Sequence, residues 1–125
     1  MIRTGSTVAP RSIESSAATA GLATLRLLGP EAYAVLDSTA AAVANLVAQH
    51  LAAAGVPHRV NAAGNLFSVF FTDAEVHDYA SAKQQDSAAY AAFFHAMLDA
   101  RVWLPPSAYE AWFVSTAHTD ADLDV

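Results

Sequence analysis

The fold prediction starts from LPPSAYEAWFVSTAH, residues 104–118. Pro105 and Pro106 each fix φ and cannot donate a backbone hydrogen bond, so we expect the preceding strand to end there. The run AWFVS, residues 111–115, is rich in apolar and β-forming side chains, which is typical of a buried strand. Glu110 lies directly before this run, and a carboxylate in that position is either half solvated or held for a partner. It is the most function-like residue of the sequence.

Composition and charge limit the classes of protein that the chain can represent. Its 125 residues are 54% hydrophobic, which is enough for one domain with a modest core and argues against a disordered chain. A net charge of −6 and a pI near 5.1 argue against nucleic acid and anionic membranes as partners. The sequence has no cysteine, which excludes disulfides and fits a reducing cytoplasm. We find no signal-peptide pattern and no apolar run of transmembrane length, so a cytoplasmic location is expected.

Two helices are predicted in the first half of the chain. Residues 1–12 are polar and show no periodicity, so we expect a loose N-terminal arm. Small side chains dominate residues 13–28, and the Gly-Pro pair that follows ends this helix. Residues 31–54 form the longest predicted helix, and Gly55 is placed to end it. Its apolar side chains recur at steps of three and four residues and form one stripe: Val35, Leu36, Val43, Leu46, Val47 and Leu51.

The apolar period then changes to that of strands. We expect a strand at residues 58–60, a turn at 61–65 and a strong strand at 66–71, with the two strands paired antiparallel. Residues 72–85 are polar and irregular. Asp86 is placed to cap a second amphipathic helix. The apolar stripe of that helix is Tyr90, Phe93, Phe94, Met97 and Leu98.

The last part of the chain completes the predicted fold. Residues 102–104 and 111–115 supply two further strands, and Asp120, Asp122 and Asp124 resemble the acidic first turn of a helix. The pattern predicts an α+β fold in the broad α/β class, in which a small antiparallel sheet has helices packed on one face in two layers. The expected core consists of Phe67, Val69, Phe71, Phe93, Phe94, Met97, Leu98, Trp112 and Val114.

Four residues with metal-binding chemistry lie close together in the sequence. They are Asp73, Glu75, His77 and Asp78, and all fall in the polar segment that precedes the second amphipathic helix. Metal sites need ligands that converge on a rigid frame, and a polar loop does not supply one. A solvated loop is therefore the favoured interpretation.

Other residues that can carry chemistry are also interpreted as structural. His95 lies between Phe94 and Ala96 on a helix, where a satisfied or solvent-facing histidine is favoured over a catalytic one. Ser115 and His118 have the types of a nucleophile and a base, but no oxyanion-hole element accompanies them. Lys83, the only lysine, lies in the polar run ASAKQQD, where a solvated ammonium is favoured over a Schiff-base amine. The residues alone therefore assign no catalytic, cofactor-binding or metal site.

Several segments, taken together and in order, identify a resemblance. They are AGLATLRLLG, GVPHRVNAAGNLFSVFFTD, DYASAK and FFHAMLDARVWLPPSAYEAWFVSTAH, which lie within residues 20–118. In this order they resemble the C-terminal part of the glutamate-1-semialdehyde 2,1-aminomutase family. That family belongs to the class III aminotransferases, which are pyridoxal-phosphate enzymes of fold type I.

The resemblance implies a fold, a reaction and one site residue. The implied fold is the C-terminal small domain of fold type I enzymes, here residues 13–125, with the last helix cut short. The implied reaction converts glutamate 1-semialdehyde to 5-aminolevulinate, the tetrapyrrole precursor, in homodimeric enzymes that bind pyridoxal phosphate. Glu110 falls on the glutamate of the family's F-E-A motif, which reaches the active site near the substrate. Tyr109 replaces the usual phenylalanine of that motif.

Two departures from the family limit what the resemblance implies. The family's pyridoxal-binding lysine lies in an upstream segment that this chain does not contain, and Lys83 falls on a surface position. The family's G-T-L-S-G-N-P motif, whose threonine contacts the cofactor phosphate, is replaced by APRSIES at residues 9–15. Neither Thr4 nor Thr7 takes that role. We therefore expect no cofactor in the isolated chain and no catalysis by it.

Three interpretations of function remain open on the sequence. The chain can be a small-domain fragment that carries a substrate-side carboxylate, Glu110, and is inactive alone. It can be a non-catalytic binding module that associates with itself, in which case residues 13–28, Trp103 and Trp112 are the expected exposed elements. It can also be one half of a split aminomutase whose N-terminal domain is a separate partner. We expect a homo-oligomer or a missing N-terminal domain as the partner, because large apolar patches are rarely left exposed. The alternative is a monomer whose arm, residues 1–12, folds back over the exposed patch.

Overall fold

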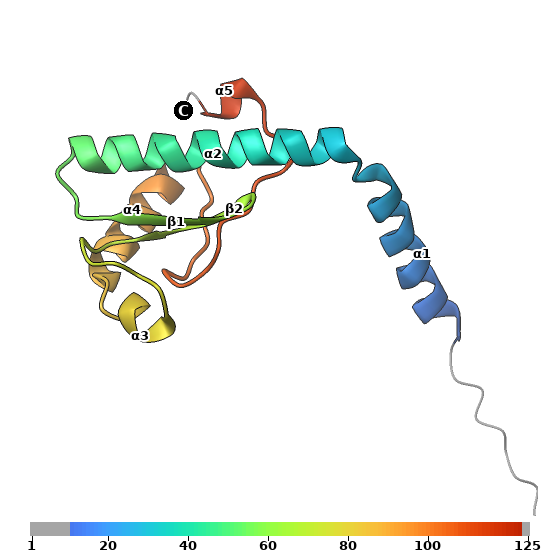
Figure 1. Cartoon of the computed structure of the whole chain (residues 1–125), viewed down its shortest axis with the longest axis horizontal. Helices are drawn as coiled ribbons and strands as arrows, with labels where there is room; N and C mark the ends of the chain where they lie inside the picture. The colour runs from blue at the N-terminus through green and yellow to red at the C-terminus, as the bar shows by residue number, and fades with distance from the viewer. Residues whose placement is uncertain (1–10, 124–125) are drawn as a thin grey trace, which may run out of the picture. The chain divides into compact units, whose positions relative to one another are not determined.

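The computed structural model describes residues 11–123 and divides the chain into two compact units, residues 1–33 and 34–125 (Figure 1). In the first unit, α1 spans Arg11–Leu27 and begins two residues before the predicted start. The rest of the predicted arm and Asp124 lie outside the described residues. From Ser15 to Leu27 every residue of α1 is exposed. Thr19 and Thr24 each donate a side-chain hydrogen bond to the carbonyl four residues earlier, which keeps these hydroxyls satisfied within the helix.

The long helix α2 spans Pro30–Ala53 and confirms the prediction for residues 31–54. Gly55 adopts a positive φ of 69° at its end. The amide of Val56 donates to the Leu51 carbonyl at 2.9 Å, and that of Gly55 donates to Ala52 at 3.0 Å. These are the two hydrogen bonds of a Schellman motif, so glycine ends the helix for the predicted reason.

The buried face of α2 differs slightly from the predicted stripe. Leu51 is buried, whereas Val35 is 43% exposed. Ala40 is only 3% exposed and belongs to the core, although the sequence analysis gave alanines no such role. Its small side chain lets the helix backbone approach the rest of the core closely.

The two strands β1 (Arg59–Ala63) and β2 (Leu66–Phe70) form one antiparallel hairpin. Their register pairs Ala63 with Leu66, so the turn is shorter than predicted. Gly64 has a φ of 62° and is the first of the two turn residues, which is the position that a type II′ turn gives to glycine. Residues 61–63, predicted as a turn, therefore belong to the strand.

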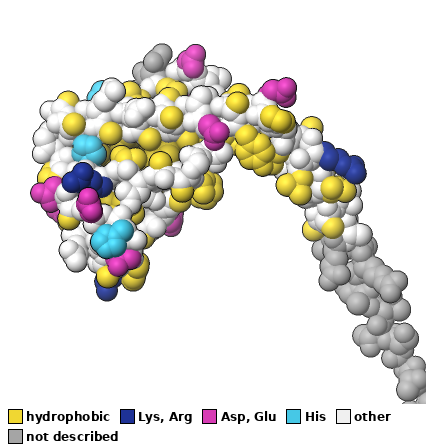
Figure 2. Space-filling model, viewed as in Figure 1, with side chains coloured by type: hydrophobic (Ala, Val, Ile, Leu, Met, Phe, Trp, Pro, Cys, Tyr) yellow, Lys and Arg dark blue, Asp and Glu magenta, His cyan; other side chains and the backbone are white. Residues whose placement is uncertain are grey.

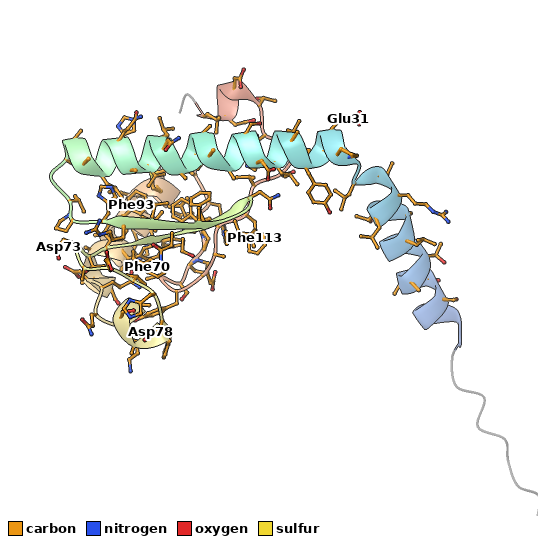
Figure 3. All side chains as sticks on the ribbon, viewed as in Figure 1. Glu31, Phe70, Asp73, Asp78, Phe93 and Phe113 are labelled. Carbon is orange, nitrogen blue, oxygen red and sulfur yellow. The ribbon has the colours of Figure 1, made fainter. Side chains whose placement is uncertain are left out.

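One face of β2 forms the centre of the core. Phe67, Val69 and Phe71 alternate along the chain and are all at most 4% exposed. Side chains of α2 and of α4 (Ser87–Asp99) pack with this face. In Figure 3, Phe93 of α4 lies in the layer between α2 and the hairpin. The rings of Phe93 and Trp112 stack with centroids 6.4 Å apart, and Phe71 meets Tyr90 edge-on at 5.6 Å.

Two aspartates begin the helices that follow the hairpin. Asp86 caps α4 as predicted, and its Oδ1 accepts from the amides of Ala88 and Ala89 at 3.0 and 2.9 Å. Asp78 caps the short helix α3 (Tyr79–Ala82), which the sequence analysis missed. The Ser81 amide donates to Asp78 Oδ1 at 2.7 Å. This hydrogen bond is the main cause of the lowered pKa of the Asp78 carboxyl.

The residue that follows the C-cap of α4 adopts a conformation that its type does not favour. Arg101 has a φ of 68°, the left-handed region that favours glycine. Its amide donates to Leu98, and the amide of Val102 donates to Met97 at 2.8 Å, which completes a second Schellman motif. Leu98, predicted in the core, is 37% exposed because it lies about 100° around the helix from Met97.

The strands predicted at residues 102–104 and 111–115 do not form. The first follows directly on the Schellman turn and ends at two prolines that lack a backbone donor. The second is confined between turns at residues 107–110 and 115–118, and makes one bridge, between Trp112 and Phe67. The sheet therefore has two strands, and the fold remains the predicted α+β arrangement of helices on a small antiparallel sheet.

A short helix, α5 (Asp120–Leu123), confirms the predicted acidic turn for Asp120 and Asp122. Asp122 Oδ2 accepts hydrogen bonds from the amide and hydroxyl of Thr119 at 2.7 and 2.8 Å. The first of these lowers the pKa of the Asp122 carboxyl most. No helix within residues 11–123 combines the length and the apolar character needed to cross a bilayer.

The packing of α2 leads to a test with two leucines. Leu51 is 7% exposed and belongs to the core, whereas Leu25 is 66% exposed. Leu51→Ala is expected to lower the free energy of unfolding by about 2–5 kcal/mol, because it removes buried methyl groups and leaves a cavity. Leu25→Ala is expected to change it by less than about 0.5 kcal/mol. Urea denaturation checks both, and equal effects would contradict the placement of α2 on the core.

Candidate functional site

The segment from Leu104 to Glu110 presents the one substrate-side residue that the sequence resemblance implies. Three side chains from other parts of the fold hold its backbone carbonyls. The Tyr90 hydroxyl donates to the Pro105 carbonyl at 2.5 Å, and Gln85 Nε2 donates to the Ala108 carbonyl at 3.0 Å. The Ser68 hydroxyl donates to the carbonyl of Glu110 itself at 3.2 Å. The segment is therefore fixed by α4, by the residues before α4 and by β2.

A tight turn places Glu110 at the end of this segment. The Glu110 amide donates to the Ser107 carbonyl at 3.2 Å, and the Tyr109 amide donates to the Ser107 hydroxyl at 3.3 Å. Between them, Ala108 is 8% exposed and anchors the turn in the core. Tyr109 and Glu110 are both exposed. The turn thus buries one side of the segment and directs the carboxylate toward solvent.

Glu110 lines a cavity of about 620 Å³ in the second unit. Most of the lining is apolar and comes from α2, the end of α4 and residues 102–114, as in Val47, Met97 and Trp112. The charged or titratable side chains in the lining are Glu110, His118 and Asp122. Figure 2 shows that hydrophobic side chains also gather beneath α2 on the face in view. A large apolar recess with a few polar groups is the usual form of a small-molecule or partner site.

The charge of Glu110 acts on the neighbouring Tyr90. Burial raises the pKa of the Tyr90 hydroxyl, and the negative charge of Glu110 raises it further, while a hydrogen bond with Trp112 opposes the shift. The Pro105 carbonyl can only accept, so the protonated phenol is the form that makes this hydrogen bond. The charge of Glu110 therefore acts on Tyr90, which is the core residue that holds the segment from Leu104 to Glu110 through Pro105.

Three of the four residues that suggested a metal site make local contacts, and Glu75 is exposed. The Asp73 carbonyl accepts two hydrogen bonds from Arg59, at 3.0 Å from Nε and 2.6 Å from Nη2, and Asp78 caps α3. His77 Nε2 lies 4.0 Å from Asp78 Oδ2. In Figure 3, Asp73 lies beside the end of the hairpin and Asp78 lies on α3. Among residues 11–123, no three His, Asp or Glu side chains are grouped so as to hold a metal ion.

The two histidines considered for catalysis also have structural surroundings. His95 is exposed and meets the ring of Phe94 edge-on at 5.5 Å. His118 Nδ1 accepts from the Ser115 amide at 2.9 Å, while the Ser115 hydroxyl accepts from the Ala117 amide. The His118 ring therefore contacts the backbone amide of Ser115. Among the described contacts, the Ser115 hydroxyl is not hydrogen-bonded to the His118 ring, as a nucleophile and its base would be.

The residues of this chain do not fit a pyridoxal Schiff-base site. Lys83 is exposed and follows α3 directly, and its Nζ lies 5.7 Å from the centroid of the Tyr79 ring. It is not among the residues that line the cavity with Glu110. The only lysine of the chain is therefore outside the cavity that the candidate substrate-side carboxylate lines.

The residues that support Glu110 were not predicted from the sequence. Gln85, assigned to an irregular polar segment, is 6% exposed and bridges two backbone groups. Tyr90 was predicted only as part of an apolar stripe, yet its hydroxyl fixes Pro105. A tyrosine in an otherwise apolar stripe is a detectable signal, because a buried phenol usually needs a hydrogen-bond partner. Gln85 follows another glutamine, and nothing in the local pattern distinguishes the two.

The raised pKa of Tyr90 predicts a loss of stability in alkali. A phenol whose pKa is raised by folding contributes stability that is present below its unfolded value of 10.0 and lost as the pH rises through the folded value. The free energy of unfolding is expected to fall above about pH 10 more steeply in the unsubstituted chain than in Tyr90→Phe. Denaturant titrations across that range measure both slopes. Identical slopes would show that Tyr90 ionises as freely in the folded state as in the unfolded one.

The amino-acid sequence of the chain was compared with those of known proteins. No protein-family model matches the chain. It is 56% identical over 110 residues to the glutamate-1-semialdehyde 2,1-aminomutase of Propionibacterium freudenreichii subsp. freudenreichii, a match that covers 88% of this chain. It is 51% identical over 110 residues to the enzyme of the same name from Cutibacterium acnes (strain DSM 16379 / KPA171202), which covers 87% of the chain. The chain spans about a quarter of the length of these curated relatives. Over most of its own length, the chain therefore resembles glutamate-1-semialdehyde 2,1-aminomutase, and a C-terminal portion of such an enzyme fits the match.

Proposed function

We propose that this chain forms part of the substrate site of a pyridoxal-phosphate aminomutase that converts glutamate 1-semialdehyde to 5-aminolevulinate. Glu110 is the substrate-side carboxylate, and the chain does not catalyse the reaction alone. The observation that carries the proposal is the placement of Glu110: an exposed carboxylate, on a turn fixed by Tyr90, Gln85 and Ser68, at the lining of an apolar cavity. The identity to the two aminomutases supports it.

The chemistry of Glu110 suits the recognition of an amino group. An ionised carboxylate accepts hydrogen bonds and attracts a cation, and such charge-assisted hydrogen bonds are the stronger ones. Because the backbone on both sides of Glu110 is fixed, little backbone freedom would be lost when a substrate binds. A bound substrate would therefore meet a carboxylate that extends from a preorganised backbone.

The position of Lys83 supports the second part of the proposal. A Schiff-base lysine needs a lowered pKa, which comes from burial or from cationic neighbours. Lys83 is exposed and lies against Tyr79. In this proposal the cofactor and its lysine belong to another domain or chain, and the complete assembly is a cytoplasmic homodimer.

A chimeric enzyme tests the role of Glu110. The matching 110 residues of the P. freudenreichii aminomutase would be replaced with those of this chain, and 5-aminolevulinate formation would be measured. The chimera is expected to be active, and Glu110→Gln is expected to lower its kcat/KM by about tenfold or more, because the substrate loses a charged partner. Glu75→Gln, a matched change at an exposed glutamate outside the cavity lining, is the control and should leave kcat/KM unchanged.

The same assay includes this chain by itself. With pyridoxal phosphate and borohydride it should form no stoichiometric adduct at Lys83 and should not turn over the semialdehyde. Turnover by the isolated chain, or an active chimera that is indifferent to Glu110→Gln, would refute the proposal.

Exposed aromatic side chains favour self-association as a second candidate function. Trp103 is 80% exposed and Phe113 is 73% exposed, and both line the cavity. Trp112 is 5% exposed and stacks in the core, which confirms its place in the predicted core and contradicts its prediction as an exposed element. Monomeric proteins rarely leave large contiguous apolar patches uncovered. A second copy of the chain, or a separately encoded aminomutase domain, would cover these two rings.

Light scattering at micromolar concentration tests this candidate. The chain is expected to form a dimer or a larger assembly, and the double substitution Trp103→Ser and Phe113→Ser is expected to make it monomeric. Tyr79→Ser, at a 69% exposed aromatic residue outside the cavity lining, should leave the assembly intact. Removing residues 1–28 tests whether α1 takes part. A monomer in every variant, with unchanged folding, would exclude self-association.

A further inference from the structure

We propose that Gln85 is a positioning residue for Glu110: its buried side-chain amide fixes the carbonyl of Ala108 and thereby the turn that presents the carboxylate. This inference rests on the proposed function of Glu110 as a substrate-side group. It goes beyond that function because Gln85 does not line the cavity, and its side-chain hydrogen bonds go to Phe71 and Ala108.

Both ends of the Gln85 amide are used, and its orientation is fixed by its partners. Oε1 accepts from the Phe71 amide at 3.3 Å, and Nε2 donates to the Ala108 carbonyl at 3.0 Å. A backbone amide only donates and a carbonyl only accepts. The reverse orientation would place Nε2 against the Phe71 amide, donor to donor, and Oε1 against the Ala108 carbonyl, acceptor to acceptor. With the side chain 6% exposed, water cannot readily replace either hydrogen bond.

Gln85 is itself held in place through the backbone. The next residue, Asp86, donates its amide to the Phe71 carbonyl at 2.9 Å, so Phe71 is bound through both its amide and its carbonyl. Asp86 also caps α4. The amide of Gln85 therefore extends from a rigid junction between the end of β2 and the start of α4.

The restraint passes from Ala108 to Glu110 through two peptide units. Ser107 and Glu110 are joined by a backbone hydrogen bond of 3.2 Å across the turn that contains Ala108. A rotation of the Ala108 carbonyl would change the direction in which the chain leaves the turn. Ser68 holds the far side of Glu110 through its carbonyl. Gln85 and Ser68 thus fix the backbone before and after the carboxylate.

The neighbouring glutamine supplies a matched control within the same chain. Gln84 is exposed, whereas Gln85 is buried. In the unsubstituted chain, hydrogen exchange measured by NMR should show side-chain amide protons of Gln85 that exchange about tenfold or more slowly than those of Gln84. Equal exchange rates at the two glutamines would overturn the proposal without any substitution.

Substitution of Gln85 with glutamate tests one of its two hydrogen bonds by removing it while keeping the other. Gln85→Glu keeps an acceptor for the Phe71 amide but removes the donor to Ala108, and Gln84→Glu makes the same charge change on the surface. Backbone exchange at Tyr109, Glu110 and Trp112 is expected to rise about tenfold in Gln85→Glu and to stay unchanged in Gln84→Glu. Gln85→Met, which keeps the shape and carries no charge, should give the same rise. No rise in either Gln85 variant would overturn the proposal.

A double-substitution cycle in the chimeric enzyme shows whether Gln85 acts through Glu110. Gln85→Glu alone is expected to lower kcat/KM, but to add little to the loss already caused by Glu110→Gln. Additive losses would mean that Gln85 acts by another route and would overturn the proposal. If Glu110→Gln alone had no effect, the proposed function would fail, while the exchange measurements would still decide whether Gln85 fixes the turn.

Discussion

The structure of the second unit depends on how the outer edge of β2 satisfies its backbone groups. In an antiparallel pair, alternate residues direct their amides and carbonyls to opposite edges. β1 occupies one edge of β2, and the core strand needs partners on the other. The Trp112 amide donates to the Phe67 carbonyl at 2.6 Å, and the Phe71 peptide groups are bound by Gln85 and Asp86. Single hydrogen bonds from separate segments therefore lie along the edge of β2 where a third strand would otherwise pair.

This arrangement places the candidate site on the same support as the core. The contacts that complete the edge of β2 also fix the segment that carries Glu110, because Gln85 reaches Ala108 and Trp112 follows Glu110 by two residues. Tyr90 adds a third restraint from α4. An exposed carboxylate is thus carried by a loop whose other side is buried. Such a loop combines solvent access with a fixed geometry, which a binding residue requires.

Glu110 could be predicted from the sequence more readily than the residues that hold its segment in place. Glu110 could be singled out because a charge directly before an apolar run is conspicuous in a sequence. Gln85 could not, because its burial depends on Phe71 and Ala108, which are 14 and 23 residues away. Arg101 was missed for a related reason: its positive φ is stabilised by two helix-ending hydrogen bonds, and the residue type does not favour that conformation.

The sequence by itself determined the longer helices, the hairpin and the apolar face of β2, because apolar period, capping residues and turn glycines act over a few positions. Gly55 and Asp86 end and begin helices where predicted, and Phe67, Val69 and Phe71 alternate into the core. The tertiary structure alone decided that two predicted strands remain irregular and that Gln85 joins β2 to the Glu110 turn. These outcomes depend on hydrogen bonds between distant segments, and such bonds are chosen by which buried backbone groups still need a partner.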